Sequence, residues 1–139
     1  MCIRDSLNID IALCETGDYE QIEAEISKGC TVLYLETPTN PTIKITDIKR
    51  LAKAAHKIAA LVVVDNTFAT PINQLPLELG ADIVLHSASK YLGGHADALG
   101  GVICGSKDLV QKVYHYREIN GATLAPMDAY SLLLSLIHI

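Results

Sequence analysis

The chain has 139 residues, of which 50% are hydrophobic and 19% are charged, and its formal net charge is −5. A chain of this length can enclose a sizeable core, and the composition excludes a disordered protein. The acidic balance, without a basic cluster, argues against nucleic acid as a partner. The four cysteines show no C-x-x-C spacing and no paired histidine pattern, so we expect no metal site. Cys30 and Cys104 lie in or beside predicted strands, which indicates buried free thiols in a reducing cytoplasm.

The two ends of the sequence are related at the level of their codons. Residues 1–6 can be encoded by ATG TGT ATA AGA GAC AG plus one base, and the reverse complement of those bases encodes residues 134–139, given one more base. Complementary ends of this kind resemble translated sequencing-adapter DNA. We therefore expect both ends to be non-native and residues 7–133 to be an internal fragment of a longer protein. We find no signal peptide or membrane span in the sequence, and we expect no membrane partner.

The first predicted elements alternate between strand and helix. Residues 7–13 alternate apolar and polar side chains, as a strand with one wetter face does. A helix is predicted from Asp18, which caps it, to Gly29. Residues 31–35 form a continuous apolar strand of the kind that is buried on both faces. Two prolines then force residues 36–41 into an extended turn.

The middle of the chain predicts a βαβ unit. Thr46 caps a helix whose inner face recurs at helical spacing, through Ile48, Leu51, Ala52 and Ala55. The strand at residues 61–64 ends in Asp65, so the strands on either side of the helix should be parallel with a right-handed crossover. An irregular link over residues 71–80, with a short helical turn, leads to a strand at residues 82–85.

The last third of the chain predicts one more strand and two helices. Glycines between residues 93 and 101 permit a tight return into a strand at residues 102–104, and no Walker pattern is present. Ser106 caps a helix whose inward side chains are Leu109, Val110, Val113 and Tyr116. A loop at residues 121–126 precedes a helix that begins at residues 127–133.

Polar groups stand at the ends of two predicted strands, where ligands bind in α/β proteins. Lys90 follows Ser87 and Ser89, and it is either a solvated turn cation or an amine nucleophile that forms a Schiff base with an aldehyde cofactor. Asp65 favours the second interpretation, because a carboxylate there can pair with a pyridinium nitrogen, as in pyridoxal phosphate enzymes. The two serine hydroxyls can donate to the cofactor phosphate. His86, at the same strand end, is interpreted as structural.

Five motifs in a fixed order resemble the Cys/Met-metabolism family of pyridoxal phosphate enzymes. This family includes cystathionine γ-synthases, cystathionine lyases, methionine γ-lyases and O-acetylhomoserine sulfhydrylases. The resemblance extends from about Leu7 to Leu133. The motifs lie at residues 36–41 (E-T-P-T-N-P), 64–68 (V-D-N-T-F), 86–91 (H-S-A-S-K-Y), 93–97 (G-G-H-A-D) and 121–126 (G-A-T-L-A-P).

The resemblance implies an α/β fold, namely a three-layer α/β/α mostly parallel sheet that is part of the large domain of a fold-type I (aspartate aminotransferase-like) enzyme. The implied cofactor is pyridoxal 5'-phosphate, bound by catalytic Lys90 as a Schiff base, with Asp65 on the pyridine nitrogen. Ser87 and Ser89 would bind the phosphate, and the family usually has threonine at the second position. Asn40 would bond the phenolic oxygen, although a turn asparagine that satisfies its own backbone is the simpler interpretation.

The implied reaction is trans-sulfuration by a lyase or transferase that acts on sulfur-containing amino acids or activated homoserine, by γ-replacement or γ-elimination. A β-eliminating cystathionine β-lyase-type enzyme and an inactive scaffold fragment are the alternatives. A nicotinamide-binding Rossmann domain is disfavoured, because no G-x-G-x-x-G follows the first strand.

The resemblance also implies a cytoplasmic homotetramer, built as a dimer of dimers, that serves methionine and cysteine metabolism. It predicts a stacking aromatic, a further glycine-rich phosphate loop and a carboxylate-binding arginine, none of which lies in these residues. We therefore expect the isolated chain to bind the cofactor weakly and to turn over little.

Overall fold

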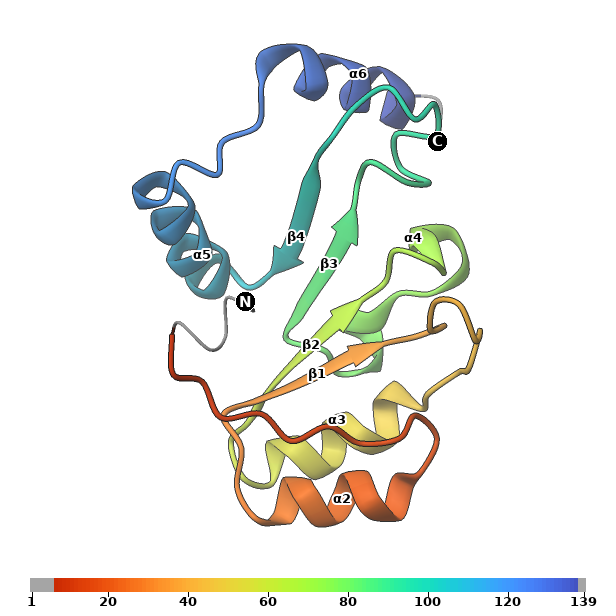
Figure 1. The fold of residues 1–139 in the computed structure, drawn as a ribbon, viewed down its shortest axis with the longest axis vertical. Helices are drawn as coiled ribbons and strands as arrows, with labels where there is room; N and C mark the ends of the chain where they lie inside the picture. Colours follow the sequence, from red (N-terminus) through yellow and green to blue (C-terminus); the bar gives the residue numbers. More distant parts are fainter. Residues whose placement is uncertain (1–6, 138–139) are drawn as a thin grey trace.

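The computed structural model describes residues 7–137 and contains one mixed sheet with helices around it (Figure 1). The strand order is β1-β2-β3-β4, and β4 alone among them runs antiparallel to its neighbour. The predicted α/β class with a mostly parallel sheet is confirmed. The elements in chain order are α2 (Tyr19–Ser27), β1 (Val32–Glu36), α3 (Ile48–His56), β2 (Leu61–Asp65), α4 (Thr70–Asn73), the 3-10 helix η1 (Pro76–Leu79), β3 (Ile83–Ser87), β4 (Gly101–Gly105), α5 (Lys107–Ile119) and α6 (Pro126–Ile137).

The main core lies between one face of the sheet and helices α2 and α3, which run side by side beneath it in Figure 1. Alternation along each strand sends every second side chain to this face. The predicted inner face of α3 is buried in full, and Leu51 and Ala55 have no exposed surface. The buried apolar residues are Ile22 and Ile26 from α2, Ile48, Leu51, Ala52 and Ala55 from α3, Leu35, Val62, Val64 and Val84 from the strands, and Ala60 and Ala81 beside them.

The N-terminal caps of the two core helices are carboxylates. Asp18 accepts a hydrogen bond from the Gln21 amide at 2.9 Å, as predicted. Asp47, and not Thr46, caps α3, because its Oδ1 accepts from the Arg50 amide at 2.9 Å. Thr46 is buried, and its amide donates instead to the Thr37 hydroxyl at 2.9 Å. Thr46 therefore belongs to the turn after β1, one residue before the cap.

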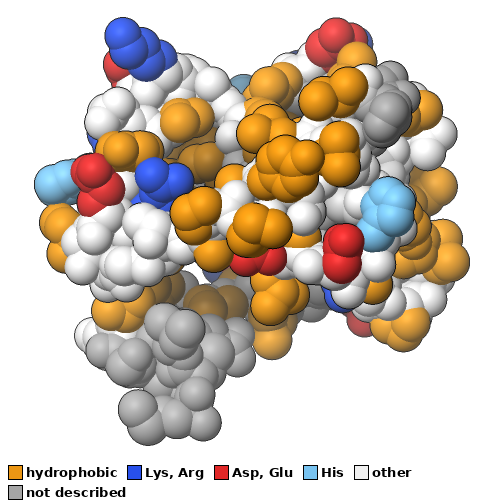
Figure 2. All heavy atoms as spheres, turned by 90° about the horizontal axis from the view of Figure 1, so that it is seen from above, with side chains coloured by type: hydrophobic (Ala, Val, Ile, Leu, Met, Phe, Trp, Pro, Cys, Tyr) orange, Lys and Arg blue, Asp and Glu red, His pale blue; other side chains and the backbone are white. Residues whose placement is uncertain are grey.

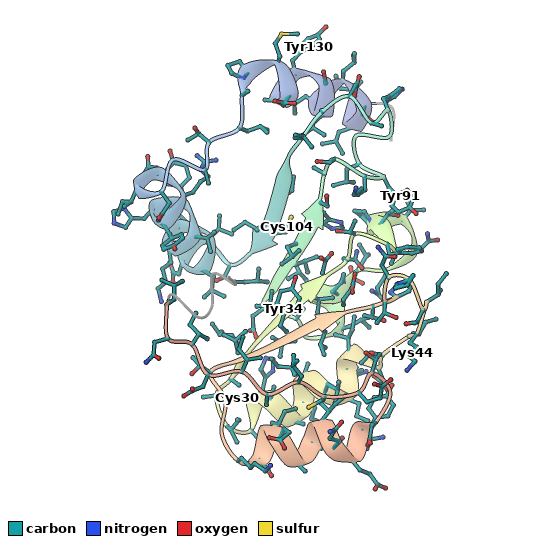
Figure 3. The ribbon with its side chains drawn as sticks, in the orientation of Figure 1. Cys30, Tyr34, Lys44, Tyr91, Cys104 and Tyr130 are labelled. Carbon is teal, nitrogen blue, oxygen red and sulfur yellow. The ribbon has the colours of Figure 1, made fainter. Side chains whose placement is uncertain are left out.

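The opposite face of β1 is open among the described residues. Val32 and Tyr34 are 47% and 57% exposed, so the prediction of a strand buried on both faces is wrong here. Figure 3 labels Tyr34 on this strand. A continuous apolar run is typical of a strand that is packed on both faces, but α2 and α3 pack against one face of β1 only.

Residues 7–13 are not a strand. They form irregular structure and belong to none of the strand pairs, and Leu13 is 79% exposed. An alternating pattern becomes a strand only where a neighbour completes the hydrogen-bond ladder, and here none does. Residues 1–6, 138 and 139 lie outside the described residues.

The second half of the molecule is less buried than its pattern predicts. None of the four expected inward residues of α5 is buried, and Val113 and Tyr116 are 39% and 60% exposed. Cys104, on the edge strand β4, is exposed, and Cys30 is half-buried, so the expectation of buried thiols is wrong (Figure 3).

Helix α6 begins one residue before the predicted segment, continues past residue 133 to Ile137 as expected, and buries only Leu132. Leu132 forms a small second core with Ala88, Leu92 and Ala98. Figure 2, viewed from this end of the molecule, shows apolar side chains spread over the surface. Within residues 7–137, no helix combines the length and the hydrophobicity that crossing a bilayer requires.

Candidate cofactor site at the strand ends

The predicted site residues lie at one edge of the sheet. Strands β1, β2 and β3 are parallel, so their carboxyl ends meet there. Asp65 is the last residue of β2 and pairs in register with Glu36 on one side and Leu85 on the other. Ser87 is the last residue of β3. The structure thus brings the carboxylate and the first hydroxyl of the predicted set to neighbouring strand ends.

The Asp65 carboxylate is half-buried, and a local turn orients it. One oxygen, Oδ1, accepts a hydrogen bond from the Thr67 amide at 3.0 Å. The Tyr34 hydroxyl also acts on this carboxylate, so a ligand that binds it would compete with Tyr34. The pKa of Tyr34 lies above its ordinary value, first because part of its ring is withdrawn from water although the residue is exposed as a whole. The charges of Asp65 and Glu36 and a hydrogen bond to Asp65 raise it further.

The end of β2 is tied to the end of β3 by a second hydrogen bond. The Ser87 amide donates to the Thr67 hydroxyl oxygen at 2.7 Å. Since Thr67 also contacts Asp65, the carboxylate and Ser87 are both held by one residue. The Ser87 hydroxyl forms no hydrogen bond with the part of the chain that the structure describes, and it is half-buried.

Lys90 lies one turn beyond β3. Its amide donates to the Ser87 carbonyl at 3.1 Å, and its carbonyl accepts from the Gly94 amide at 2.7 Å. The side chain is exposed, and among residues 7–137 its ammonium takes part in no ion pair. The backbone of Lys90 is therefore fixed while its amine is available.

Ser89 is held against the strand that follows the lysine turn. Its hydroxyl accepts from the Gly100 amide at 2.9 Å, and its amide donates to the Gly100 carbonyl at 3.3 Å. A side chain at Gly100 would lie 2.7 Å from the end of the Leu132 side chain, which would have to shift. The same hydroxyl also donates its hydrogen to the Gly100 carbonyl at 3.4 Å, a long hydrogen bond. Ser89 would have to give up this bond to donate to an anion, so its predicted role at the phosphate stays a prediction.

Asn40 lies in the exposed turn after β1. The turn is closed by the Thr39 amide, which donates to the Lys44 carbonyl at 3.0 Å, and by the Ile43 amide, which donates to the Thr39 carbonyl at 2.8 Å. The Asn40 side chain does not satisfy its own backbone through a hydrogen bond within the described residues. It therefore stands free at the same edge as Asp65.

His86 is buried, with 6% of its surface exposed, and its Nδ1 has no partner in the described part of the chain. Burial lowers the pKa of this imidazole below 6.5, although the charge of Asp65 acts in the opposite direction. The neutral form is favoured, which agrees with the structural interpretation of this residue.

Two polar residues that join the strand ends, Asn66 and Gln74, were not predicted from the sequence. The side chain of Gln74 reaches both the Thr37 carbonyl, at 2.9 Å, and Asn66, at 2.8 Å. Asn66 lies inside the motif at residues 64–68, but the bond from Gln74 to the Thr37 carbonyl spans 37 residues, so local spacing does not reveal the link. Thr67 lies inside a quoted motif, but its role as a link to Ser87 was not predicted.

The residues present fit pyridoxal phosphate by their chemistry. An amine that forms no ion pair within residues 7–137, a carboxylate, and the Ser87 and Ser89 hydroxyls lie at or just beyond neighbouring strand ends. A hollow of about 330 Å³ lies beside the lysine turn and is lined by Thr70, Pro71, Ile72, Tyr91, Leu92 and Leu136. A hollow of about 400 Å³ between α2 and α3 contains none of the predicted site residues.

Comparison with known proteins agrees with the motifs. The sequence profile of the family described as "Cys/Met metabolism PLP-dependent enzyme" matches residues 2–136. A cystathionine γ-lyase of Bacillus subtilis is 45% identical over 132 residues, which are 94% of this chain and 35% of that protein. A cystathionine β-lyase of Lactococcus lactis is 43% identical over 119 residues, which are 85% of this chain and 31% of that protein.

The fold is similar to that of solved enzymes. The crystal structure of an apo methionine γ-lyase from Micromonospora echinospora superimposes with a TM-score of 0.92 at 34% identity, covering 96% of this chain and 37% of that one. The chain thus spans about a third of the length of the proteins it matches.

Proposed function

Because the chain belongs to the Cys/Met metabolism family of pyridoxal phosphate-dependent enzymes, we propose that it carries part of the cofactor-binding domain of a trans-sulfuration enzyme. The substrate class is a sulfur-containing amino acid or an activated homoserine, and the reaction is γ-elimination or γ-replacement. The observation that carries this proposal is the shared strand edge, where Thr67 contacts both Asp65 and Ser87 and Lys90 follows one turn later.

Each residue at this edge has a role that follows from its chemistry. Asp65 would accept a hydrogen bond from the pyridine N–H and so keep that nitrogen protonated. Ser87 would donate to the phosphate, and Ser89 would do so in exchange for its 3.4 Å bond to the Gly100 carbonyl. Asn40 would donate to the phenolic oxygen. When bound, pyridoxal phosphate supplies a sink for the electrons released at the substrate's α carbon.

Lys90 would act twice. Its Nζ would attach to the cofactor aldehyde, and after release by the substrate amine it would take a proton from Cα and return it at a neighbouring carbon. Both roles require an amine that no ion pair holds, and Lys90 forms none among residues 7–137.

The second candidate reaction is β-elimination. The Lactococcus lactis relative is named as a cystathionine β-lyase and is nearly as similar to this chain as the γ-lyase of Bacillus subtilis. The two reactions differ in the carbon from which the sulfur group leaves. Assaying the full-length parent with cystathionine separates them, because γ-cleavage releases cysteine and β-cleavage releases homocysteine.

The parent enzyme is further proposed to be a cytoplasmic homotetramer. The described residues hold three cysteines, Cys14, Cys30 and Cys104, all of them free thiols. Unpaired thiols suit a reducing compartment.

The test is covalent labelling of the chain with pyridoxal phosphate. We expect an absorbance band near the visible edge, and borohydride reduction followed by peptide mapping should locate the adduct at Lys90. Lys90→Ala should abolish the band, whereas Lys49→Ala, which removes an exposed lysine of α3, should retain it. Equal labelling of Lys90→Ala and the unmodified chain would overturn the proposal. We expect turnover by the chain alone to be small.

A further inference from the structure

The side chain of Gln74 lies between the ends of β1 and β2. Its Nε2 donates one hydrogen bond to the Thr37 carbonyl at 2.9 Å and another to Asn66 Oδ1 at 2.8 Å. The Gln74 carbonyl in turn accepts from Asn66 Nδ2 at 3.0 Å. Thr37 and Asn66 are 0% and 1% exposed. Three separate segments thus meet in one buried polar network.

Main-chain atoms fix the orientation of both amides in this network. The carbonyls of Thr37 and Gln74 can only accept hydrogen bonds, so the NH₂ groups of Gln74 and Asn66 must face them. Both donor hydrogens of Gln74 are then used, one toward each strand end. A side chain without a donor at position 74 would leave two buried acceptors unpaired.

The network borders the candidate site on two sides. Thr37 is followed within three residues by Asn40, and Asn66 is the residue directly after Asp65. The Asn66 amide also donates to the Leu85 carbonyl at 2.9 Å, which ties β2 to β3. The turn that carries Asn40, the strand end that carries Asp65 and the strand that leads to Ser87 are therefore connected through Gln74 and Asn66.

We propose that Gln74 is a positioning residue of the cofactor site. It contacts none of the residues assigned to the cofactor. Instead it fixes the Asn40 turn against the Asp65 strand end, so that both side chains can bind the same cofactor ring. This inference rests on the proposed function, because it concerns how the chain holds pyridoxal phosphate.

The variant that tests it is Gln74→Glu, which keeps the size of the side chain and removes both donor hydrogens at neutral pH. The control is Asn73→Asp, the same amide-to-carboxylate change one residue earlier. Asn73 is exposed, and its Nδ2 donates only to the Ala69 carbonyl of its own turn, at 2.9 Å. The probe is pyridoxal phosphate, titrated by absorbance against the Lys90-dependent band from about pH 8 to about pH 5.5.

We expect Gln74→Glu to bind pyridoxal phosphate about tenfold more weakly than the unmodified chain at pH 8. The ratio of the two dissociation constants should decrease as the pH is lowered, because the partly buried position between two acceptors favours the protonated carboxyl, which regains one O–H donor. Circular dichroism of Gln74→Glu at each pH separates the two roles, because a merely structural loss would appear as unfolding and a misplaced site would not. Asn73→Asp should bind as the unmodified chain does at each pH.

The possible failures are distinguishable. No Lys90-dependent band in the unmodified chain would overturn the proposed function, and the role of Gln74 with it. A normal band with unchanged affinity in Gln74→Glu would overturn the role of Gln74 alone. If Gln74→Glu unfolds, the isosteric and uncharged Gln74→Met repeats the measurement at pH 8. Unfolding of both variants would overturn the inference, because Gln74 would then support the fold and not the site.

Discussion

The part of the chain that contains α2 and α3 and the part that contains α5 and α6 differ in how far their helices are buried. Helix α3 has nine residues and buries four of them, whereas α5 has thirteen residues and buries none. Both helices carry apolar residues at helical spacing, and both have a side-chain N-cap. The difference lies in the partner, because α3 has the sheet and α2 to pack against. An amphipathic pattern therefore predicts which face of a helix can be buried, but not whether it is.

The candidate site draws on both halves. Asp65 and the strand ends belong to the half with the closed core, and the Lys90 turn rests on the small second core through Ala88 and Leu92. Leu132 of α6 completes that second core. The geometry of the lysine turn should therefore depend on a helix that is otherwise exposed.

The largest expected effect is in the closed core. Leu51→Ala removes a side chain with no exposed surface and should lower the free energy of unfolding by about 3 kcal/mol. Ile119→Ala in α5 removes a side chain that is 71% exposed and should cost less than about 1 kcal/mol. Urea unfolding of the chain followed by circular dichroism measures both. Equal losses would mean that α5 is as well packed in solution as α3.

The next effect concerns the contact between α6 and the lysine turn. Gly100→Ala places a methyl group 2.7 Å from Leu132 and 3.2 Å from Leu124, and overpacking of this kind costs about 2 kcal/mol. Gly101→Ala is the control, since its nearest neighbour would be the His86 carbonyl at 3.8 Å. Urea unfolding compares the two, and the double variant Gly100→Ala, Leu132→Ala shows whether removing the obstructing side chain relieves the strain. A neutral Gly100→Ala would show that α6 does not press on the turn.

The helix caps give a smaller effect. Asp47→Ala removes the hydrogen bond to the Arg50 amide and should destabilise the chain by about 1 kcal/mol. Ser106→Ala removes a longer bond, 3.4 Å to the Leu109 amide, from a helix without buried residues, so its effect should be about half as large. Thermal unfolding of both variants against the unmodified chain tests this order. A larger loss in Ser106→Ala would contradict it.

Local sequence patterns, such as helical spacing and the ends of apolar runs, predicted the features that depend on neighbouring residues. The inner face of α3 follows from its spacing, and Asp65 stands at a strand end because an apolar run stops there. The choice between Thr46 and Asp47 as the cap was not local, because a bond from Thr46 to Thr37, nine residues away, decides it. The roles of the site residues came from a resemblance, and the structure adds where those residues lie.

Contacts between residues that are far apart in the chain could not be predicted from sequence patterns. Residues 7–13 have the alternation of a strand, yet pairing depends on a neighbour that the pattern does not contain. Gln74 bonds a carbonyl 37 residues away, so no spacing rule could single it out. Tyr34 and Val113 were predicted to be buried, because an apolar pattern does not show whether another element packs against that face of the strand or helix.

The smallest predicted effect is a pH dependence that comes from His86 on β3. Burial lowers the pKa of His86 below its ordinary value of 6.5, so between the two values the unfolded chain binds more protons than the folded chain. The stability that this histidine contributes is therefore fully present above pH 6.5 and is lost as the pH falls through the lowered value.

His86→Gln should flatten the decline in urea midpoint from about pH 7.5 to about pH 5.5. His115→Gln, which changes an exposed residue of α5, should follow the unmodified chain throughout. Carboxylates contribute at the acid end in all three proteins, so the difference between curves is the quantity to compare. If His86→Gln lost stability as steeply as the other two, the imidazole would not be held neutral in the folded chain. The end of β3 would then be more open to water than the buried surface of His86 indicates.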